Sequence, residues 1–416
     1  MNSSNFCQSS SNDISSYSEH FNPLQTVWTF VLCSTMFVQQ SKAPYVCARC
    51  LRARRQYSTP ANATVPPPPP LASGAAKLTN RRLLSVYGDD APKFLQGIIS
   101  NNVRPEPGSG FYAAFLTALG KVLNDVFIYP TSGTQWHIDQ DRGGKQGYLV
   151  EVDAGEAESL YKHLKKHKLR SNLTLRLLEA GELDVWSVWR EDERWTAHGR
   201  AVLEDGILGL MDCRAPGMGQ RVLLRPGDAV GEVDEAPESA YTIRRYLRGV
   251  PEGQKEIPWN DSLPMNHNID IMGGIDFKKG CYLGQELTIR THHTGVVRRR
   301  ILPVALYAHE GLPPDTLEYD PGASIRTVKA GTEIRRDDQR RRPTAKLIGS
   351  VGNVGLGMCR LEQMSDLTVS AEGSSYSPDD RFLLETSSGQ ELGVKAFVPD
   401  WIRGRVREPK LQKRVE

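Results

Sequence analysis

Residues 278–293 read KKGCYLGQELTIRTHH and form the most distinctive stretch of the 416-residue chain. Within it, Gly280 and Gly284 bracket the pair Cys281 and Tyr282. Glycine lets the backbone turn sharply or approach a ligand closely. The spacing therefore predicts that the cysteine is presented on a bend of the chain.

Positive charge flanks this cysteine in the sequence. Lys278 and Lys279 precede it, and Arg290 follows it. A nearby cation lowers the pKa of a thiol and favours the thiolate, which attacks electrophiles and binds soft metals. Such a Cys281 could ligate iron, carry sulfur or be oxidised. From the residues alone a second interpretation stays open, because a single cysteine often serves as a small buried apolar side chain.

The stretch resembles the KGCYxGQE signature of the YgfZ family, whose members are related to the aminomethyltransferases of glycine cleavage. The resemblance extends from about residue 83 to residue 401. It implies an α+β, aminomethyltransferase-like folate-binding fold, with mixed α/β domains around a central cavity and a C-terminal antiparallel β-barrel. It assigns a functional thiol to Cys281 and supporting roles to seven residues around it: Lys279, Gly280, Tyr282, Gly284, Gln285, Glu286 and Arg290.

The continuation THHTG at 291–295 resembles the mitochondrial branch of this family. That resemblance implies a mitochondrial-matrix factor for the maturation of [4Fe-4S] proteins, such as aconitase-type enzymes and the radical enzymes lipoate synthase and biotin synthase. The implied partners are A-type iron-sulfur scaffold proteins and these client enzymes. A transient iron-sulfur cluster at Cys281 is left open. The alternative is a folate-dependent aminomethyl or one-carbon transferase.

Two departures from the aminomethyltransferases concern the folate site. Their hairpin carries adjacent aspartates, whereas here Asn124 precedes Asp125 and leaves one carboxylate. Their following helix ends in Arg-x-Glu-x-Gly, whereas here Leu247 stands two residues after Arg245 in place of the glutamate. A leucine side chain cannot accept hydrogen bonds from a pterin. We expect a folate cavity beside Asp125 and Arg245. Whether tetrahydrofolate binds there is left open, and we expect transferase turnover to be weakened or absent.

Hydrophobic periodicity predicts two α+β domains, at 78–182 and 183–297, followed by a strand-only domain at 298–416 that is typical of a small barrel. Strands are expected at 82–87, 111–119, 122–129, 185–189, 222–224, 301–306, 347–351 and 392–398, and the second and third of these flank Gly120 and predict a β-hairpin. Helices are expected at 91–96, 156–166 and 240–248, the last of which stops at Gly249, and polar loops are expected at 335–342 and 365–380.

Residues 1–57 have the composition of a mitochondrial presequence. No Asp or Glu occurs from residue 20 to residue 88, and basic residues gather up to Arg55. The bond between Tyr57 and Ser58 resembles a matrix-peptidase junction, and Met36 offers an alternative start to Met1. A disordered basic tail is the other interpretation. Residues 58–77 include five consecutive prolines and are expected to be a disordered linker.

The charge distribution gives no support to nucleic-acid binding. The formal net charge is +3, but the excess lies in residues 1–57, and the remainder is balanced. Arginines at 335–336 and 340–342 flank two aspartates, which is typical of a solvated loop. No run of eighteen apolar residues predicts membrane insertion.

The remaining cysteines and histidines are weaker candidates. Four of the seven cysteines lie in the predicted presequence, and the other three are too far apart in sequence to predict a disulfide framework. We expect structural roles for Cys213 and Cys359. On a strand, His292 and His293 would face opposite sides, so joint metal binding is not expected.

Overall fold

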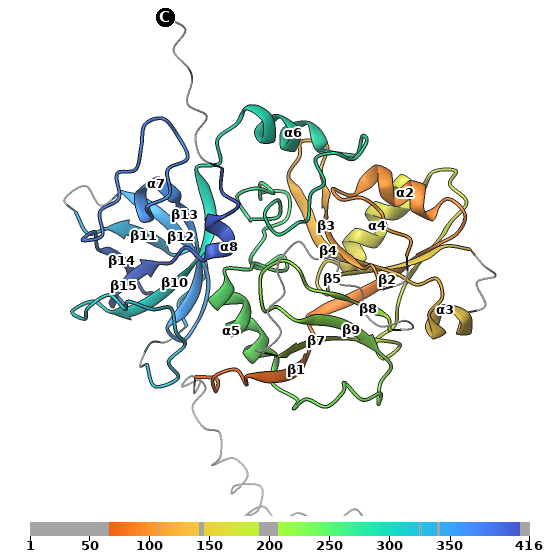
Figure 1. The fold of residues 1–416 in the computed structure, drawn as a ribbon, viewed down its shortest axis with the longest axis horizontal. Helices are drawn as coiled ribbons and strands as arrows, with labels where there is room; N and C mark the ends of the chain where they lie inside the picture. The colour runs from red at the N-terminus through yellow and green to blue at the C-terminus, as the bar shows by residue number, and fades with distance from the viewer. Residues whose placement is uncertain are drawn as a thin grey trace, which may run out of the picture. The chain divides into compact units, whose positions relative to one another are not determined.

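The structure is a computed structural model, and it describes residues 66–106, 108–140, 145–190, 207–323, 325, 327–338 and 342–407. These residues form a five-stranded sheet, a four-stranded sheet and a closed six-stranded barrel, with short helices packed around them (Figure 1). The predicted presequence and its cleavage site lie outside the described residues. Within the described ranges, no helix has the length and apolar character that crossing a bilayer requires.

The strands are β1 (Ser73–Lys77), β2 (Arg81–Tyr87), β3 (Phe111–Leu116), β4 (Val122–Pro130), β5 (Gly147–Asp153), β6 (Thr174–Leu177), β7 (Asp184–Arg190), β8 (Gly209–Met211), β9 (Gln220–Leu224), β10 (Arg299–Ala308), β11 (Glu333–Arg336), β12 (Pro343–Val351), β13 (Val354–Arg360), β14 (Phe382–Glu385) and β15 (Glu391–Ala396). The helices are α2 (Ala91–Ile98), α3 (Gln135–Asp139), α4 (Ala157–Lys168), α5 (Glu238–Arg248), α6 (Gln285–Thr294), α7 (Leu361–Met364) and α8 (Asp400–Arg403).

The first sheet has the strand order β3-β4-β5-β2-β6, and the apolar faces of α2 and α4 contribute to its core. The predicted hairpin of β3 and β4 is confirmed. Its turn contains Gly120 at φ +77°, a left-handed conformation that favours glycine. A side chain at Gly120 would place its Cβ 2.7 Å from the Cβ of Leu287. The hairpin turn therefore lies directly against α6.

The second sheet has the order β1-β7-β9-β8, and its first strand lies where the sequence predicted linker. β1 pairs along its whole length with β7, and Ala75 and Ala76 are fully buried. A Cβ on Gly74 would lie 3.0 Å from the ring of Trp189. The small residues that suggested a linker are thus required for packing against an indole. The folded part begins before residue 78.

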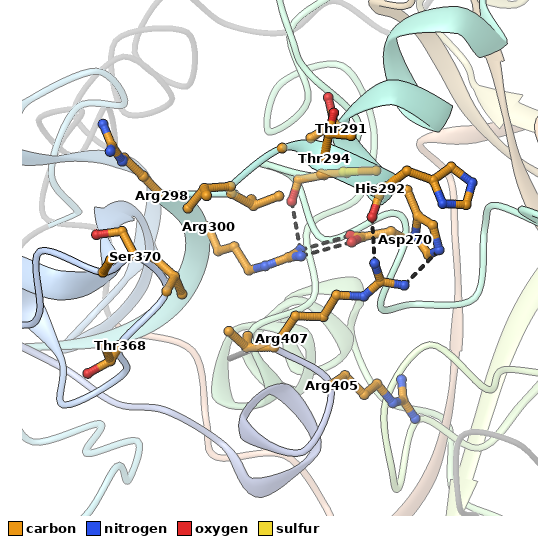
Figure 2. Close-up of a pocket in the computed structure, with 18 of the residues that line it drawn as sticks. Asp270, Thr291, His292, Thr294, Arg298, Arg300, Thr368, Ser370, Arg405 and Arg407 are labelled. Carbon is orange, nitrogen blue, oxygen red and sulfur yellow. Dashed lines mark hydrogen bonds and ion pairs between the residues drawn. The ribbon is translucent and has the colours of Figure 1, made fainter. Parts of the chain in front are cut away.

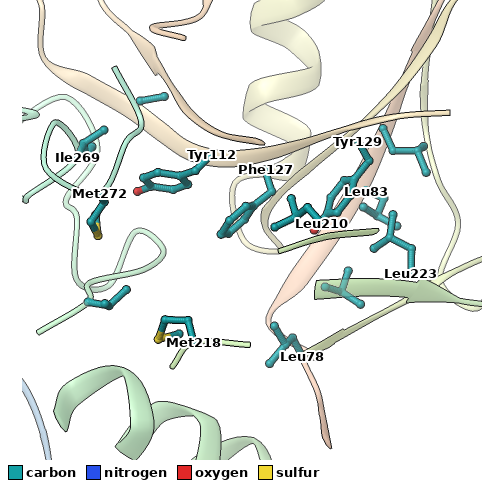
Figure 3. Close-up of a cluster of buried hydrophobic side chains, with 14 of the residues drawn as sticks. Leu78, Leu83, Tyr112, Phe127, Tyr129, Leu210, Met218, Leu223, Ile269 and Met272 are labelled. Carbon is teal, nitrogen blue, oxygen red and sulfur yellow. The ribbon is translucent and has the colours of Figure 1, made fainter. Parts of the chain in front are cut away.

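One hydrophobic cluster joins these two sheets (Figure 3). Phe127 of β4 and Leu223 of β9 belong to it, together with Ile269 and Met272 from the long loop that precedes α6. Tyr282 is a member of the same cluster. The approach to α6 is therefore anchored in the core on both sides of the exposed turn.

The C-terminal barrel is confirmed as a closed antiparallel sheet in the order β10-β13-β12-β11-β14-β15. β10 closes it by pairing with both β13 and β15. The start of the loop predicted at 335–342 is instead the end of strand β11, where Arg335 and Arg336 pair with Leu383 and Phe382 of β14. Helix α5 ends at Gly249, φ +71°, as the sequence predicted.

Candidate functional site

Cys281 lies exposed in the turn before α6. The other two cysteines of the described chain are covered by protein: Cys213 is half-buried and Cys359 is buried. Burial raises the pKa of Cys213 to about 11 and the pKa of Cys359 to about 12. Both thiols are therefore held in the unreactive neutral form, as expected for structural cysteines.

The two glycines around the thiol have different structural roles. Gly284 is the N-cap of α6 at φ +81°, and a Cβ there would lie 2.2 Å from the carbonyl oxygen of Thr117. Both its conformation and its packing against the hairpin turn exclude a side chain. Gly280 has no such requirement, since a Cβ there would meet nothing within 4 Å. Gly280 thus leaves open space next to Cys281.

Lys279 connects the loop of residues 276–284, called here the thiol loop, to the C-terminal end of helix α2. Its ammonium donates hydrogen bonds to the carbonyl oxygens of Gln96, Ile99 and Asn101 at 2.8, 2.7 and 2.9 Å. The same ammonium lies 4.8 Å from the ring centroid of Tyr282. Burial lowers the pKa of Lys279 to about 8. Its three donors are committed to backbone carbonyls, and its predicted effect on the pKa of the thiol stays a prediction.

The end of the thiol loop is closed by Tyr282 and Gln285. The Tyr282 backbone N–H donates to the Gln285 side-chain oxygen at 3.2 Å, and the Gln285 N–H donates to the Tyr282 carbonyl at 3.3 Å. The buried Tyr282 hydroxyl lies 3.1 Å from the hydroxyl of Thr288. Leu283 donates its N–H to the carbonyl of Gly97. These contacts explain why both Tyr282 and Gln285 belong to the motif.

Helix α6 begins at Gln285, inside the motif, so His292 and His293 lie on a helix and not on the strand considered for them from the sequence. The β-branched residues of this stretch favour strands, but packing of Leu287 and Thr288 holds them helical. His292 stacks on the ring of Phe277 with centroids 3.6 Å apart.

Glu286 and Arg290 are exposed and occupy neighbouring positions one turn apart on α6. Glu286 stands in the first turn, where a carboxylate is stabilised by the helix dipole.

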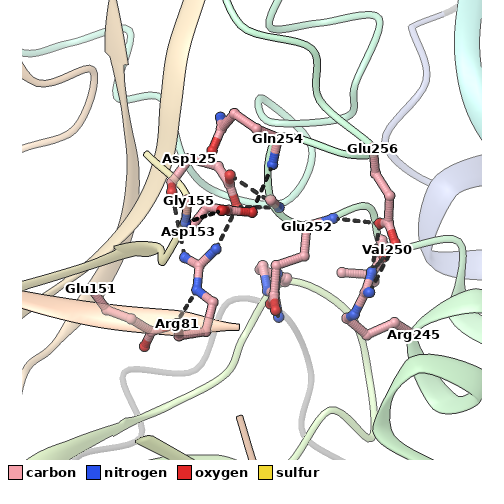
Figure 4. A network of polar contacts seen from close by, with 12 residues as sticks. Arg81, Asp125, Glu151, Asp153, Gly155, Arg245, Val250, Glu252, Gln254 and Glu256 are labelled. Carbon is pink, nitrogen blue, oxygen red and sulfur yellow. Dashed lines mark hydrogen bonds and ion pairs between the residues drawn. The ribbon is translucent and has the colours of Figure 1, made fainter. Parts of the chain in front are cut away.

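The two residues predicted beside a folate cavity lie in a buried polar network (Figure 4). Asp125 accepts the Gly253 backbone N–H at 3.1 and 3.2 Å and lies 3.9 Å from the Arg81 guanidinium. Burial raises the pKa of Asp125, and Arg81 opposes that rise. Arg245 makes two charged hydrogen bonds to Glu256, at 2.7 and 2.9 Å. Both predicted residues are therefore engaged with protein partners.

A second part of the network was not predicted. Glu252 accepts hydrogen bonds from Arg221 at 2.9 and 3.0 Å and from the Tyr241 hydroxyl at 2.7 Å, and its Oε2 lies 2.8 Å from a nitrogen of Arg214. Although burial opposes ionisation, Arg221 and Arg214 hold the pKa of Glu252 well below its usual range. Little in the sequence indicated this part of the network, because a charged residue that will be buried cannot be told from a surface residue until its partners are known.

Several buried polar atoms near this network have hydrogen-bonding capacity that the described protein does not use. They are the Tyr112 hydroxyl, the Asn124 amide nitrogen, Glu252 Oε1 and Gln254 Oε1. This donor and acceptor set fits the polar edge of a ligand such as a pterin. Leu247, in contrast, packs in a cluster with barrel residues that include Ile301 and Val354.

Among the residues that the structure describes, no group of three or more His, Cys, Asp or Glu side chains is arranged to hold a metal ion.

Comparison with known proteins gives matches to the barrel and to most of the chain. Residues 298–404 match the family model described as CAF17, C-terminal beta-barrel domain. The chain is 44% identical to a protein of Aspergillus fumigatus named iron-sulfur cluster assembly factor IBA57 homolog, mitochondrial, with 86% of this chain and 89% of that protein covered. Proteins of the same name from Pyricularia oryzae and Neurospora crassa are 46% and 39% identical, over 86% and 88% of this chain and 92% and 90% of theirs.

Among solved structures, the aminomethyltransferase T of the glycine cleavage system from Bartonella henselae has the same fold. The TM-score is 0.53 and the identity 13%, over 81% of this chain and 88% of that one. The predicted aminomethyltransferase-like fold is thus confirmed.

Proposed function

Since the chain belongs to the family of mitochondrial iron-sulfur cluster assembly factors that includes the IBA57 homologs, we propose that it assists the maturation of [4Fe-4S] proteins in the mitochondrial matrix through the thiol of Cys281. The observation that carries the role of the thiol is its exposure on a loop whose neighbours are fixed. Lys279 is held by carbonyl groups at the end of α2, Tyr282 by the hydrophobic cluster that joins the two sheets, and Gly284 by the turn of the β3–β4 hairpin.

This arrangement suits a thiol that meets another protein. A thiolate is a soft ligand for iron-sulfur clusters, and most clusters take four cysteine ligands. Cys281 would supply one ligand, and the cluster, as cargo, would bring the others from the protein that carries it. A loop that is already ordered adds little entropic cost to such an encounter.

The partners that fit this function are an A-type iron-sulfur scaffold protein and the [4Fe-4S] enzymes that receive the product. Aconitase-type enzymes, lipoate synthase and biotin synthase are the client classes implied by the family resemblance. We place Cys281 at the contact with these partners and assign the supporting motif residues to loop geometry. Gly280 keeps the approach to the sulfur uncovered, because a side chain there would project into open space.

A folate-dependent transferase is the second candidate, and one observation favours a retained ligand. The unpartnered polar atoms of Tyr112, Asn124 and Gln254 would hold the polar edge of tetrahydrofolate, which when bound would supply one-carbon chemistry. Asp125, however, is occupied by Gly253 and Arg81. We therefore favour a binding role for this region over transferase turnover.

A strain that lacks the chain separates these functions. We expect this strain to lose aconitase activity and protein lipoylation. Its aminomethyl-transfer step of glycine cleavage should be unchanged when it is assayed with lipoylated carrier protein prepared separately. Normal [4Fe-4S] enzyme activities in the deletion strain would overturn the proposed function. Tetrahydrofolate-dependent aminomethyl transfer by the purified chain would favour the second candidate.

A further inference from the structure

A cavity of about 870 Å³ opens between the end of α6, the start of β10, a barrel loop and the C-terminal segment (Figure 2). Four arginines line it: Arg298, Arg300, Arg405 and Arg407. We call it the arginine groove. None of these residues could be selected from the sequence, because they come from the two ends of the barrel domain and lie close together only in the folded chain.

The guanidinium groups of two of these arginines donate hydrogen bonds to uncharged acceptors. Arg407 donates to the carbonyl oxygen of His292 at 2.5 Å and contacts the His292 ring nitrogen at 2.6 Å. Arg405 donates to the carbonyl oxygen of Ile271, and burial lowers its pKa. A carbonyl satisfies a donor without cancelling its charge. Both guanidinium groups therefore retain their attraction for an anion.

The other two arginines have carboxylate partners but are incompletely satisfied. Arg300 is 4% exposed and makes two hydrogen bonds of 2.8 Å to Asp270, while its Nε is buried with no partner among the described residues. Arg298 lies 3.5 Å from Glu372, and both side chains are largely exposed. A third carboxylate, that of Glu362, lies behind the lining and accepts hydrogen bonds from Val369 and Ser370. Four arginines against three carboxylates leave a net positive charge at the groove.

Apolar side chains lie between these charges. Val296, Val297, Val369, Ala371 and Val406 line the same cavity, and Val296 is 48% exposed. A single phosphate or carboxylate ion would fill only a small part of 870 Å³ and would leave the exposed side chains of Val296 and Ala371 uncovered. An extended peptide, whose side chains alternate in direction, can place carboxylates on the arginines and apolar groups on Val296 and Ala371.

The position of the groove relative to Cys281 indicates which partner would use it. Helix α6 has ten residues, so it is about 15 Å long, with the thiol loop at its start and the groove at its end. A typical protein interface covers about 800 Å² on each partner and spans such a distance. One bound protein can contact both features, whereas a small anion in the groove cannot reach the thiol.

We propose that the arginine groove binds an acidic, extended segment of the iron-sulfur protein that meets Cys281. This proposal rests on the proposed function for the identity of the partner, but not for the chemistry of the groove. Binding at both ends of α6 would raise the affinity of the encounter and would fix the orientation of the partner's cluster relative to the thiol.

A fluorescent ten-residue peptide of alternating Asp and Val tests the groove with the full chain. We expect anisotropy to report binding that salt weakens, and a peptide of alternating Asn and Val to bind at least about tenfold more weakly. The double variant Arg298→Gln/Arg407→Gln should lose about tenfold or more in affinity. The control Arg335→Gln removes an exposed arginine that pairs with Glu333 on the barrel and should bind as wild type does.

Three outcomes would overturn the proposal. They are equal binding of the acidic and neutral peptides, equal loss in the groove and control variants, and complete competition by inorganic phosphate at the peptide's own concentration. Tighter, arginine-dependent binding of a single-stranded oligonucleotide would reassign the groove to nucleic acid. Melting temperatures of all variants check that they are folded.

The deletion strain keeps this result separate from the proposed function. Full rescue of the [4Fe-4S] enzymes by the double variant, while Cys281→Ser fails to rescue them, is one informative result. That result would reject the role proposed for the groove and would still support the proposed function. If the groove binds the peptide but deletion of the chain affects no [4Fe-4S] enzyme, the groove is supported and the proposed function is rejected.

Discussion

The ammonium nitrogen of Lys279 lies 2.7 Å from the carbonyl oxygen of Ile99, at the C-terminal end of helix α2. Helix ends leave carbonyl groups without intrahelical partners, and a cation there is favourable. Because Gln96 and Asn101 offer two more carbonyls, one lysine satisfies three acceptors and fixes the thiol loop.

Replacement of Lys279 by methionine should therefore destabilise the protein although no charge pair is lost. We expect a decrease of about 1–3 kcal/mol in the free energy of unfolding at pH 7, because buried carbonyls lose their donors. Lys278→Met is the matched control, since Lys278 is exposed and adjacent in sequence. Urea denaturation measures both. Equal effects of the two substitutions would contradict the assigned role.

The same lysine predicts a pH dependence. Burial lowers the pKa of folded Lys279 from 10.5 to about 8. Between these values the unfolded chain holds a proton that the folded chain has released, so stability from this group rises with pH. The difference in free energy of unfolding between wild type and Lys279→Met should widen as pH increases from 8 to 10. A difference that narrows over this range would show that the pKa is not lowered.

Replacement by alanine should destabilise the protein strongly at one glycine of the motif and very little at the other. Gly284→Ala introduces a Cβ at φ +81° and within 2.2 Å of the Thr117 carbonyl oxygen, so we expect a loss of at least about 2 kcal/mol. Gly280→Ala should change stability by about 0.5 kcal/mol or less, because its Cβ would meet nothing within 4 Å. Thermal and urea denaturation of the two variants provide the comparison. Similar stabilities would contradict the packing described for Gly284.

Much of the architecture could be predicted because its signals are local. Alternation of apolar residues located the barrel strands, and Gly120 and Gly249 marked a turn and a helix end whose backbone requires glycine. Strand β1 was missed because Gly74 and its small neighbours have the composition of a linker. Their order depends on packing against Trp189, which lies far away in the sequence.

The site was predicted in part for a similar reason. The motif located Cys281, but the partners of Lys279 lie about 180 residues earlier, and nothing near the lysine indicates them. The pair of Arg81 and Glu151 is separated by 70 residues, so its burial could not be inferred from the sequence either. Charged side chains acquire a structural role only when the fold brings partners together.

Thiol labelling should distinguish the cysteines without reference to function. Of the three cysteines that the structure describes, Cys281 should be modified first when native protein is treated briefly with iodoacetamide at pH 8. Burial raises the pKa of Cys213 to about 11 and that of Cys359 to about 12, so their thiolate fractions are small. Peptide mapping by mass spectrometry measures each site, with urea-unfolded protein as the reference for full reactivity. Faster modification of Cys213 or Cys359 than of Cys281 would contradict the exposure described here.

The functional test of Cys281 compares a thiol role with a packing role. Cys281→Ser keeps nearly the same volume and removes the soft ligand, so a functional thiol predicts a folded protein that fails to restore aconitase activity in the deletion strain. Cys281→Ala should fail equally. Because Cys281 is exposed, neither change should lower the free energy of unfolding by more than about 0.5 kcal/mol.

The matched control is Cys213→Ser, which makes the same chemical change at a half-buried thiol and should still rescue the strain if the protein folds. Expression and melting temperature, measured in parallel, separate loss of chemistry from loss of protein. A stable Cys281→Ser variant that restores full aconitase activity would mean that the exposed sulfur is dispensable. The ordered loop that Lys279 and Gly284 hold would then have to act through its shape, since shape is what this substitution preserves.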